Sequence, residues 1–273
     1  MQNESTIAQW ETWRSVAEKA AREAGQIILQ KREQPLQRIS KGFRDLVTDA
    51  DFAAQQCITE MVKTEFPTHG FLAEEEDAEL PDVGDARWII DPIDGTSNYS
   101  RHMTNFCVSI GVLSRDNQLV VGVIYDPLHD ELFSATLGQG ATRNRQSIHV
   151  SDIKELSEAA LCLDWGRKFE ERDLSLRTLS TLGHNVRTIR AIGSAALALA
   201  WIACGRLDAY LNYNLGAWDV AGGSLLVTEA GGTVSSMSGM PLVWGGREKI
   251  GAVVSAGPFH QELLTYMLSS VDP

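Results

Sequence analysis

Apolar side chains near the N-terminus recur at helical spacing. From residue 6 to residue 31 they return every three or four positions, which places them on one face of a helix. A second run of this kind covers residues 51–66 and stops before Pro67, which cannot continue a helix. The sequence therefore predicts two amphipathic helices in its first quarter.

Up to about residue 150 the apolar residues then come in short runs rich in β-branched and aromatic side chains. Such runs cover residues 87–90, 106–113, 118–125 and 131–135. Turn signals such as Arg115-Asp116-Asn117 and Asp126-Pro127 separate the last three. This spacing predicts an antiparallel meander.

Beyond residue 151 the pattern alternates between strands and helices. It predicts strands at 159–163, 186–189 and 207–211, helices at 170–182, 194–204 and 217–230, and two late strands. We place a boundary near Ser151, which gives an N-terminal α+β domain over residues 1–150 and a C-terminal α/β domain over residues 151–273. Because no Gly/Ser-rich or Pro-rich linker separates them, we expect the halves to pack tightly around a cleft.

Composition narrows the classes of partner. The 273 residues are 44% hydrophobic and 22% charged, and 24 basic against 36 acidic residues give a formal net charge of −12. Such a charge disfavours nonspecific binding to nucleic acid or to an anionic membrane. With neither a signal peptide nor an apolar run of transmembrane length, a cytoplasmic protein is predicted. Cys57, Cys107, Cys162 and Cys204 fit neither a zinc site nor a disulfide scaffold, so free thiols are predicted.

The most informative polar stretch follows the predicted strand 87–90 and places Asp91 and Asp94 on either side of Pro92 and Ile93. Pro92 lacks a backbone donor, so we expect it to end the strand and leave Asp91 at the strand's carboxyl end. Gly95 permits a tight turn, and a helix starting after it would point N–H groups at an anion such as phosphate. A divalent cation would let carboxylates and phosphate share this place. Taken alone, a solvated Asx turn explains this stretch equally well.

Three distant stretches also place carboxylates at the ends of elements. Asp51 lies at a helix start, Glu74 and Glu75 follow a short apolar run, and Asp219 lies in the first turn of helix 217–230. Helix capping explains Asp51 and Asp219 individually, and a solvated acidic loop explains residues from Glu76 onward. Capping does not explain why all these carboxylates occur together in one chain.

Together these residues resemble the inositol monophosphatase family of magnesium-dependent, lithium-sensitive phosphatases. Two stretches carry the resemblance, in order and at family spacing: Trp88-x-x-Asp91-Pro92-Ile93-Asp94-Gly95-Thr96-x-Asn98, and Trp218-Asp219-Val220-Ala221-Gly222-Gly223 followed by Glu229-Ala230-Gly231-Gly232. The resemblance covers essentially the whole chain. It implies an α/β protein built as a layered α/β/α/β/α sandwich of the sugar phosphatase type, and a homodimer.

The resemblance also implies a set of metal ligands. A first Mg²⁺ would take Glu74, Asp91 and the main-chain carbonyl of Ile93, and a second would take Asp91, Asp94 and Asp219. A third, weaker ion near Glu74 is a further family feature, so two or three ions per site are expected.

Catalytic and supporting roles follow from the same resemblance. Thr96 and Asp51 would orient the attacking water, and Glu74 is a second candidate for receiving its proton. The backbone N–H groups of Gly95 and Thr96 would hold the phosphate, and a water near Asp94 would protonate the leaving alkoxide. Lys41 and Glu75 match supporting positions around the metals.

The alcohol side of the site is less well specified. Gly193-Ser194-Ala195 matches the family's Gly-Thr-Ala substrate turn, whereas Asn212 stands where inositol-preferring members carry a glutamate. Met103-Thr104-Asn105 departs from a frequent Pro-Phe pair. The expected substrate is a small polyol or sugar phosphate, with inositol 1-phosphate as the default. Fructose 1,6-bisphosphate, 3′-phosphoadenosine 5′-phosphate and histidinol phosphate are alternatives, as is a catalytically silent module that binds a phosphate ligand.

Overall fold

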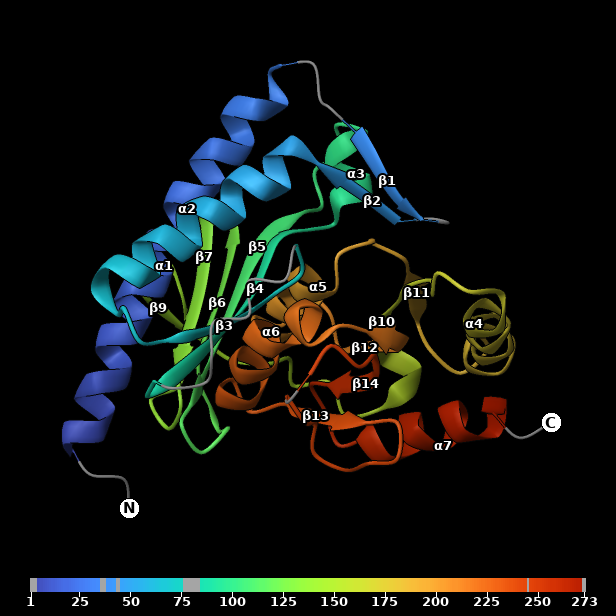
Figure 1. Cartoon of the computed structure of the whole chain (residues 1–273). Coiled ribbons are helices and arrows are strands. Elements are labelled where there is room, and N and C mark those ends of the chain that lie inside the picture. Colours follow the sequence, from blue (N-terminus) through green and yellow to red (C-terminus); the bar gives the residue numbers. More distant parts are fainter. Residues whose placement is uncertain (1–3, 35–37, 43–44, 76–83, 245, 272–273) are drawn as a thin grey trace.

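Five layers of helix and sheet make up the computed structural model, which describes residues 4–34, 38–42, 45–75, 84–244 and 246–271 (Figure 1). Helices α1 (Glu4–Arg32) and α2 (Asp49–Glu65) cover the outer face of a seven-stranded sheet. Helices α5 (Ala195–Ala203) and α6 (Ala217–Glu229) fill the space between this sheet and a five-stranded one. The predicted α/β class and the layered sandwich are confirmed.

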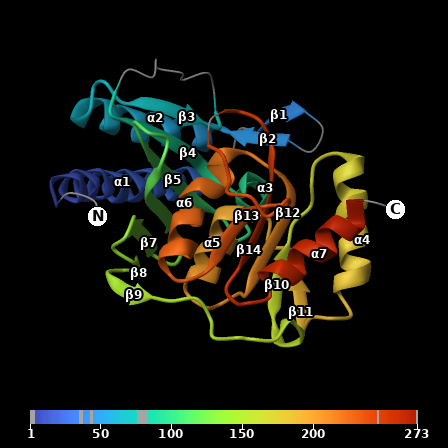
Figure 2. The same ribbon diagram turned by 90° about the horizontal axis from the view of Figure 1, so that it is seen from below.

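The fifth layer consists of α4 (Phe169–Leu182) and α7 (His260–Val271). These helices pack on the face of the second sheet that points away from α5 and α6, as Figure 2 shows from below. Both predicted N-terminal helices are present, and α1 buries Trp10, Trp13 and Ile28 against α2 and the first sheet. Helix α7 is an addition to the prediction, which ended the chain on strands. Its apolar side chains Leu263, Leu264 and Met267 are buried.

The first sheet has the order β3-β4-β5-β6-β7-β8-β9. Its strands are β3 (Gly70–Ala73), β4 (Ala86–Asp94), β5 (Cys107–Ser114), β6 (Leu119–Asp126), β7 (Glu131–Thr136), β8 (Ala141–Arg143) and β9 (Gln146–Ile148). The predicted meander is confirmed, because β5, β6 and β7 pair antiparallel in sequence. The β8–β9 hairpin that extends it was not predicted.

The expectation that Pro92 ends its strand is wrong. β4 continues to Asp94, and its register against β5 shifts between Asp91, opposite Ser109, and Asp94, opposite Cys107. Three steps along β4 therefore face two steps along β5, which is a β-bulge, and a bulge tolerates a residue without a backbone donor. In a regular strand Asp91 and Asp94 would point to opposite faces, but the extra residue turns both to the same face.

The second sheet has the order β11-β10-β12-β14-β13 and mixes parallel and antiparallel pairs. Its strands are β10 (Ala160–Leu163), β11 (Thr188–Arg190), β12 (Ala209–Leu215), β13 (Thr233–Ser236) and β14 (Ile250–Ser255). The change from one sheet to the other falls between Ile148 and Ala160. The division into two domains near Ser151 stays a prediction.

A short hairpin of β1 (Arg38–Gly42) and β2 (Asp45–Thr48), also unpredicted, leads into α2 beside the five-residue helix α3 (Thr96–Ser100) (Figure 1). Among the described residues, none of the helices is long and apolar enough to cross a membrane.

Glycines bring α6 unusually close to the first sheet. A Cβ atom on Gly122 of β6 would lie 2.3 Å from the backbone oxygen of Gly222 in α6, and one on Gly222 would lie 2.9 Å from the oxygen of Ile110. This close approach places the first turn of α6, which carries Asp219, against the bulged end of β4.

Replacing Gly122 with Ala therefore tests the packing that positions α6. The added methyl group meets rigid backbone, so we expect Gly122→Ala to lower the free energy of unfolding by roughly 1–3 kcal/mol. Gly246→Ala is the control, since its Cβ would meet nothing nearer than 3.9 Å. Urea unfolding of both variants is the measurement, and equal midpoints for Gly122→Ala and the wild type would contradict the argument.

Candidate metal and phosphate site

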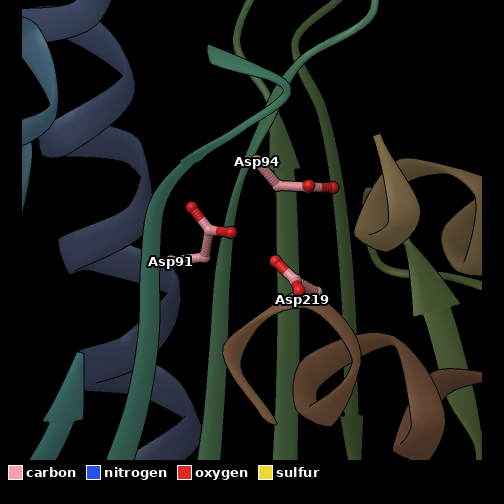
Figure 3. Close-up of side chains that lie close together, drawn as sticks. All are labelled: Asp91, Asp94 and Asp219. Carbon is pink, nitrogen blue, oxygen red and sulfur yellow. The ribbon is translucent and has the colours of Figure 1, made fainter. Parts of the chain in front are cut away.

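Three aspartates from two distant parts of the chain converge at the bulged end of β4. Asp91 and Asp94 extend from β4 and Asp219 from the first turn of α6 toward a shared space (Figure 3). One carboxylate oxygen from each lies within 4.8 Å of the other two. The structure thus brings together three of the predicted metal-binding side chains.

Hydrogen bonds fix two of these carboxylates. Asp94 Oδ2 accepts hydrogen bonds from Ser194 Oγ and from the backbone N–H of Ala196, both at 2.6 Å. Asp219 Oδ2 accepts one from the backbone N–H of Gly216 at 2.5 Å, which closes the first turn of α6. Both orientations are therefore set by hydrogen-bond donors that belong to the second half of the chain.

Glu74 lies beside Asp91 because their strands run parallel. β3 and β4 pair with Ala73 opposite Ile90, so Glu74, the residue after β3, comes level with Asp91 in β4. The Glu74 N–H donates to the Ile90 carbonyl at 3.0 Å. Within the described residues, the tight group of three aspartates does not include Glu74, whose Oε1 lies 3.8 Å from Arg167 Nη2.

The like charges and their burial disfavour the ionised forms. Burial, followed by the charges of Glu74, Asp94 and Asp219, raises the pKa of Asp91 well above its ordinary value. Burial and then the charge of Asp219 raise the pKa of Asp94 to about 7. Burial also raises the pKa of Asp219, although the nearby cations Lys249 and Arg167 oppose that shift. A cation bound among these oxygens would favour the ionised forms of the three carboxylates.

The residues present fit a hard divalent cation. Asp91 Oδ1 is buried without a hydrogen-bond partner, and a buried carboxylate oxygen in that state is costly unless a positive charge binds it. The donor set around it consists of carboxylates, which suit Mg²⁺ and leave out the nitrogen and sulfur ligands that zinc prefers. The cluster could therefore bind a metal ion of the magnesium type.

Asp51 approaches the site through Thr96. Thr96 Oγ1 lies 3.1 Å from Asp51 Oδ1 and 3.0 Å from the Ile93 carbonyl oxygen. Asp51 lies in the first turn of α2, as predicted, but it is the third helical residue and the N-cap is Thr48. Asp51 Oδ2 accepts hydrogen bonds from the Thr48 N–H and hydroxyl, at 2.8 and 2.6 Å. Burial raises its pKa to about 6.

The predicted phosphate turn meets the predicted substrate turn. Gly95 has φ +98°, and a Cβ there would lie 2.7 Å from the Asn105 oxygen and 3.2 Å from the Gly193 oxygen. Asn98 Nδ2 holds the two turns together by donating to the carbonyls of Asn105 and Ile192, at 2.7 and 2.8 Å. Gly95 is the N-cap of α3, so the helix starts directly after the turn, as expected.

A pocket of about 840 Å³ opens from the aspartates toward the second sheet. Asn212, the departure from the family pattern, lines it but is buried, and both polar ends of its amide are engaged within the chain. Its Nδ2 donates to Tyr210 Oη at 3.0 Å, and its Oδ1 accepts from the Asn214 N–H at 2.9 Å. Ser194 and Ala195 line the same pocket, and the Ser194 hydroxyl is engaged with Asp94.

Sequence reasoning missed part of the pocket wall. Asp164 is buried at the end of β10 and accepts a hydrogen bond from the Gly193 N–H at 2.9 Å. Trp165, Arg167 and Lys249 line the pocket as well. Asp164 follows an apolar strand just as Asp91 does, so the rule that sites form at the carboxyl ends of strands would have found it. No local signal marks Lys249.

The structure describes one of the two supporting side chains, Glu75, and all four cysteines. The Glu75 N–H donates to Gln55 Oε1 at 3.0 Å, which ties the end of β3 to α2. The side chain of Lys41 and the acidic residues from Glu76 to Asp82 lie outside what the structure describes. The predicted free thiols are confirmed, with Cys107 and Cys162 buried and Cys57 and Cys204 half-buried.

Comparisons with known proteins identify the family of this chain. The inositol monophosphatase family model matches residues 9–271. Inositol monophosphatase 1 of Solanum lycopersicum is 39% identical over 84% of this chain and 86% of its own. The crystal structure of the extragenic suppressor protein suhB from Bartonella henselae is 32% identical, with a TM-score of 0.87 over 93% of this chain and 97% of that one.

A third relative is inositol monophosphatase II of Staphylococcus aureus, solved with 2′AMP bound, at 29% identity and a TM-score of 0.81 over 96% of each chain. It has also been solved with inositol monophosphate bound. The chain described here belongs to the inositol monophosphatase family, and it is a phosphoric monoester hydrolase.

The raised pKa values predict how the stability of the metal-free protein depends on pH. Asp51 and Asp94, at about 6 and 7, hold protons that the unfolded chain releases near pH 3.9. Stability therefore falls as the pH rises through this window, by about 1.4 kcal/mol per pH unit for each extra proton. A bound cation favours the ionised forms, so Mg²⁺ should raise Tm more at pH 8 than at pH 5.

Thermal denaturation in EDTA and in Mg²⁺ between pH 5 and 8 measures this effect. Burial lowers the pKa of His69 and His260, so these two side chains make stability rise with pH below about pH 6.5. The Asp94→Asn variant keeps both histidines, so comparing it with the wild type isolates the contribution of Asp94. In EDTA, the fall in Tm above pH 6.5 should be smaller in Asp94→Asn than in the wild type. A pH-independent gain in Tm from Mg²⁺ would contradict the argument.

Proposed function

We propose that the protein is a magnesium-dependent phosphomonoesterase that hydrolyses a small polyol phosphate, inositol 1-phosphate, to the alcohol and inorganic phosphate. The observation that carries the proposal is the convergence of Asp91, Asp94 and Asp219 beside the turn at Gly95. A relative whose structure holds inositol monophosphate supports the choice of substrate.

The proposed ion sites use the carboxylates at the bulge. Glu74, Asp91 and the Ile93 carbonyl would hold one Mg²⁺, and Asp91, Asp94 and Asp219 a second, with a third, weaker ion near Glu74. When bound, such ions lower the pKa of water and neutralise charge that develops on the phosphoryl oxygens.

The proton of the attacking water has a path through this chain's own residues. The Thr96 hydroxyl can accept a hydrogen bond from that water while donating its own proton to Asp51 Oδ1, 3.1 Å away. A pKa of about 6 leaves Asp51 ionised at neutral pH and ready to accept a proton. Glu74 is the second candidate for the same role.

The proposed substrate groups lie on either side of the bulge. Backbone N–H groups of Gly95 and Thr96, at the start of α3, would bind the phosphate. Asp94, oriented by Ser194 and Ala196, would hold the water that protonates the leaving alkoxide. Gly193, Ala195 and Asn212 would shape the alcohol side, Asn212 through its bonds to Tyr210 and Asn214.

A homodimer, a cytoplasmic location and inhibition by lithium belong to the same proposal. The acidic charge gives no support to a nucleic-acid or membrane partner. The mass of the protein in solution decides the oligomeric state.

Substituting Asp94 tests the enzyme against the catalytically silent alternative. Asp94→Asn keeps an oxygen that can accept the bonds from Ser194 and Ala196 but removes the negative charge. We expect it to lower kcat on inositol 1-phosphate by at least about 100-fold with an unchanged circular dichroism spectrum. Asp116→Asn, on an exposed turn, is the matched control and should keep full activity. Unchanged turnover in Asp94→Asn would contradict the proposed phosphomonoesterase mechanism.

Two substitutions at Thr96 separate its hydroxyl from its shape. Thr96→Val removes the proton path to Asp51, so we expect kcat to fall by about 10²- to 10⁴-fold with little change in KM. Thr96→Ser keeps the hydroxyl and should keep activity within about tenfold. Initial rates at saturating Mg²⁺ measure both. Equal loss in the two variants would mean that the methyl group matters and the hydroxyl does not.

A further inference from the structure

Two basic side chains of the pocket lie beside its carboxylates. Arg167 Nη2 is 3.8 Å from Glu74 Oε1. Lys249 lines the same pocket as Asp219, and its Nζ lies 4.8 Å from the ring centroid of Trp218, the residue before Asp219. In the proposed ion sites, Glu74 belongs only to the first Mg²⁺ and Asp219 only to the second. Each site therefore has one positively charged side chain near the ligand that it does not share.

These two cations counter the charge of the carboxylates. Burial raises the pKa of Asp219, and Lys249 and then Arg167 oppose this shift. Arg172 also lines the pocket, but its Nε donates to the Gly166 carbonyl at 3.0 Å. Closely spaced carboxylates are unfavourable without positive charge nearby. Arg167 and Lys249 thus supply part of the charge that stabilises the metal-free site.

Both cations are placed where a metal ion can replace them. The Arg167 side chain keeps 47% of its surface accessible, and its 3.8 Å separation from Glu74 is longer than a hydrogen bond. Lys249 is exposed as well. A Mg²⁺ ion binds carboxylate oxygens at about 2.0–2.1 Å and carries two charges, so it interacts with them more strongly than either side chain does.

We infer that Arg167 and Lys249 are counterions of the metal-free site, one for each Mg²⁺ position, and that they weaken Mg²⁺ binding and so set the Mg²⁺ concentration that the enzyme requires. A fixed positive charge beside a ligand repels the incoming dication. The same charge stabilises the protein while the metal is absent. This inference rests on the proposed function, because it concerns the same ion sites.

Calorimetric titration of the metal-free protein with Mg²⁺, without substrate, provides the test. Arg167→Gln and Lys249→Gln remove one charge each, and we expect each to lower the Kd for Mg²⁺ about five- to tenfold, since solvent screens part of the repulsion. Arg167→Lys keeps the charge and should stay within about threefold of the wild type.

Lys168→Gln is the matched control, because it changes the net charge of the protein by the same amount. Lys168 is exposed and is not among the residues lining the described pocket. Salt screens such a charge, so the Kd for Mg²⁺ should change less than twofold. An equal decrease in Kd for Lys168→Gln and Arg167→Gln would mean that net charge alone acts, and it would overturn the inference.

Thermal denaturation separates a counterion from a side chain that only packs. In EDTA, Arg167→Gln and Lys249→Gln should have a lower Tm than the wild type, because the carboxylates lose a neutralising charge. In saturating Mg²⁺ this difference should disappear, since the metal has replaced the counterion. A loss of Tm that is equal in EDTA and in Mg²⁺ would assign the side chain a packing role and overturn the inference.

The titration also distinguishes this inference from the proposed function. If the wild type hydrolyses no phosphate ester, the proposed function fails, and the change in Kd for Mg²⁺ still decides whether the two cations oppose the metal. Unchanged or weaker Mg²⁺ binding in either Gln variant would contradict the assignment of one counterion to each site.

Discussion

The close approach of three like charges, two of them buried and one half-buried, is the constraint on which the arrangement of the rest depends. Asp91, Asp94 and Asp219 place oxygens within 4.8 Å of one another, burial raises the pKa of each, and the charges of neighbouring carboxylates raise the pKa of Asp91 and Asp94 further. Such a group is unfavourable unless protons or cations neutralise it. The fold therefore supplies the rigidity to hold the carboxylates together, through the bulge in β4 and the glycine contacts under α6.

The contacts that hold the carboxylates come from both halves of the chain, so the two halves must pack together for a site to exist. Asp94 comes from the first sheet but is oriented by Ser194 and Ala196 at the start of α5, and Asp219 comes from α6, between the sheets. Asn98 likewise joins the phosphate turn to the substrate turn. A shift of one sheet against the other would therefore disturb the carboxylates and the pocket together.

The features that the sequence predicted correctly are those determined by residues close together in the chain. The meander, the helix 217–230 and the first-turn position of Asp219 follow from periodicity and turn residues near in sequence. The bulge did not follow, because it depends on which β5 residues face β4, and this register is not visible in the residues around Pro92. The same reason applies to Asp51: the sequence marks a helix start there, but the cap is Thr48, whose backbone and hydroxyl both bond to Asp51.

The alcohol side was the least predictable part because it is assembled from residues that carry no motif. Asn212 attracted attention as a departure from the family pattern, yet both ends of its amide make a hydrogen bond within the wall of the pocket. Trp165 and Lys249 reach the pocket from loops whose paths depend on tertiary packing. Phosphate chemistry requires charged groups at fixed positions, so its residues recur in order along the chain. Recognition of the alcohol requires only a surface of the right shape, so the residues that form this surface need not share a motif.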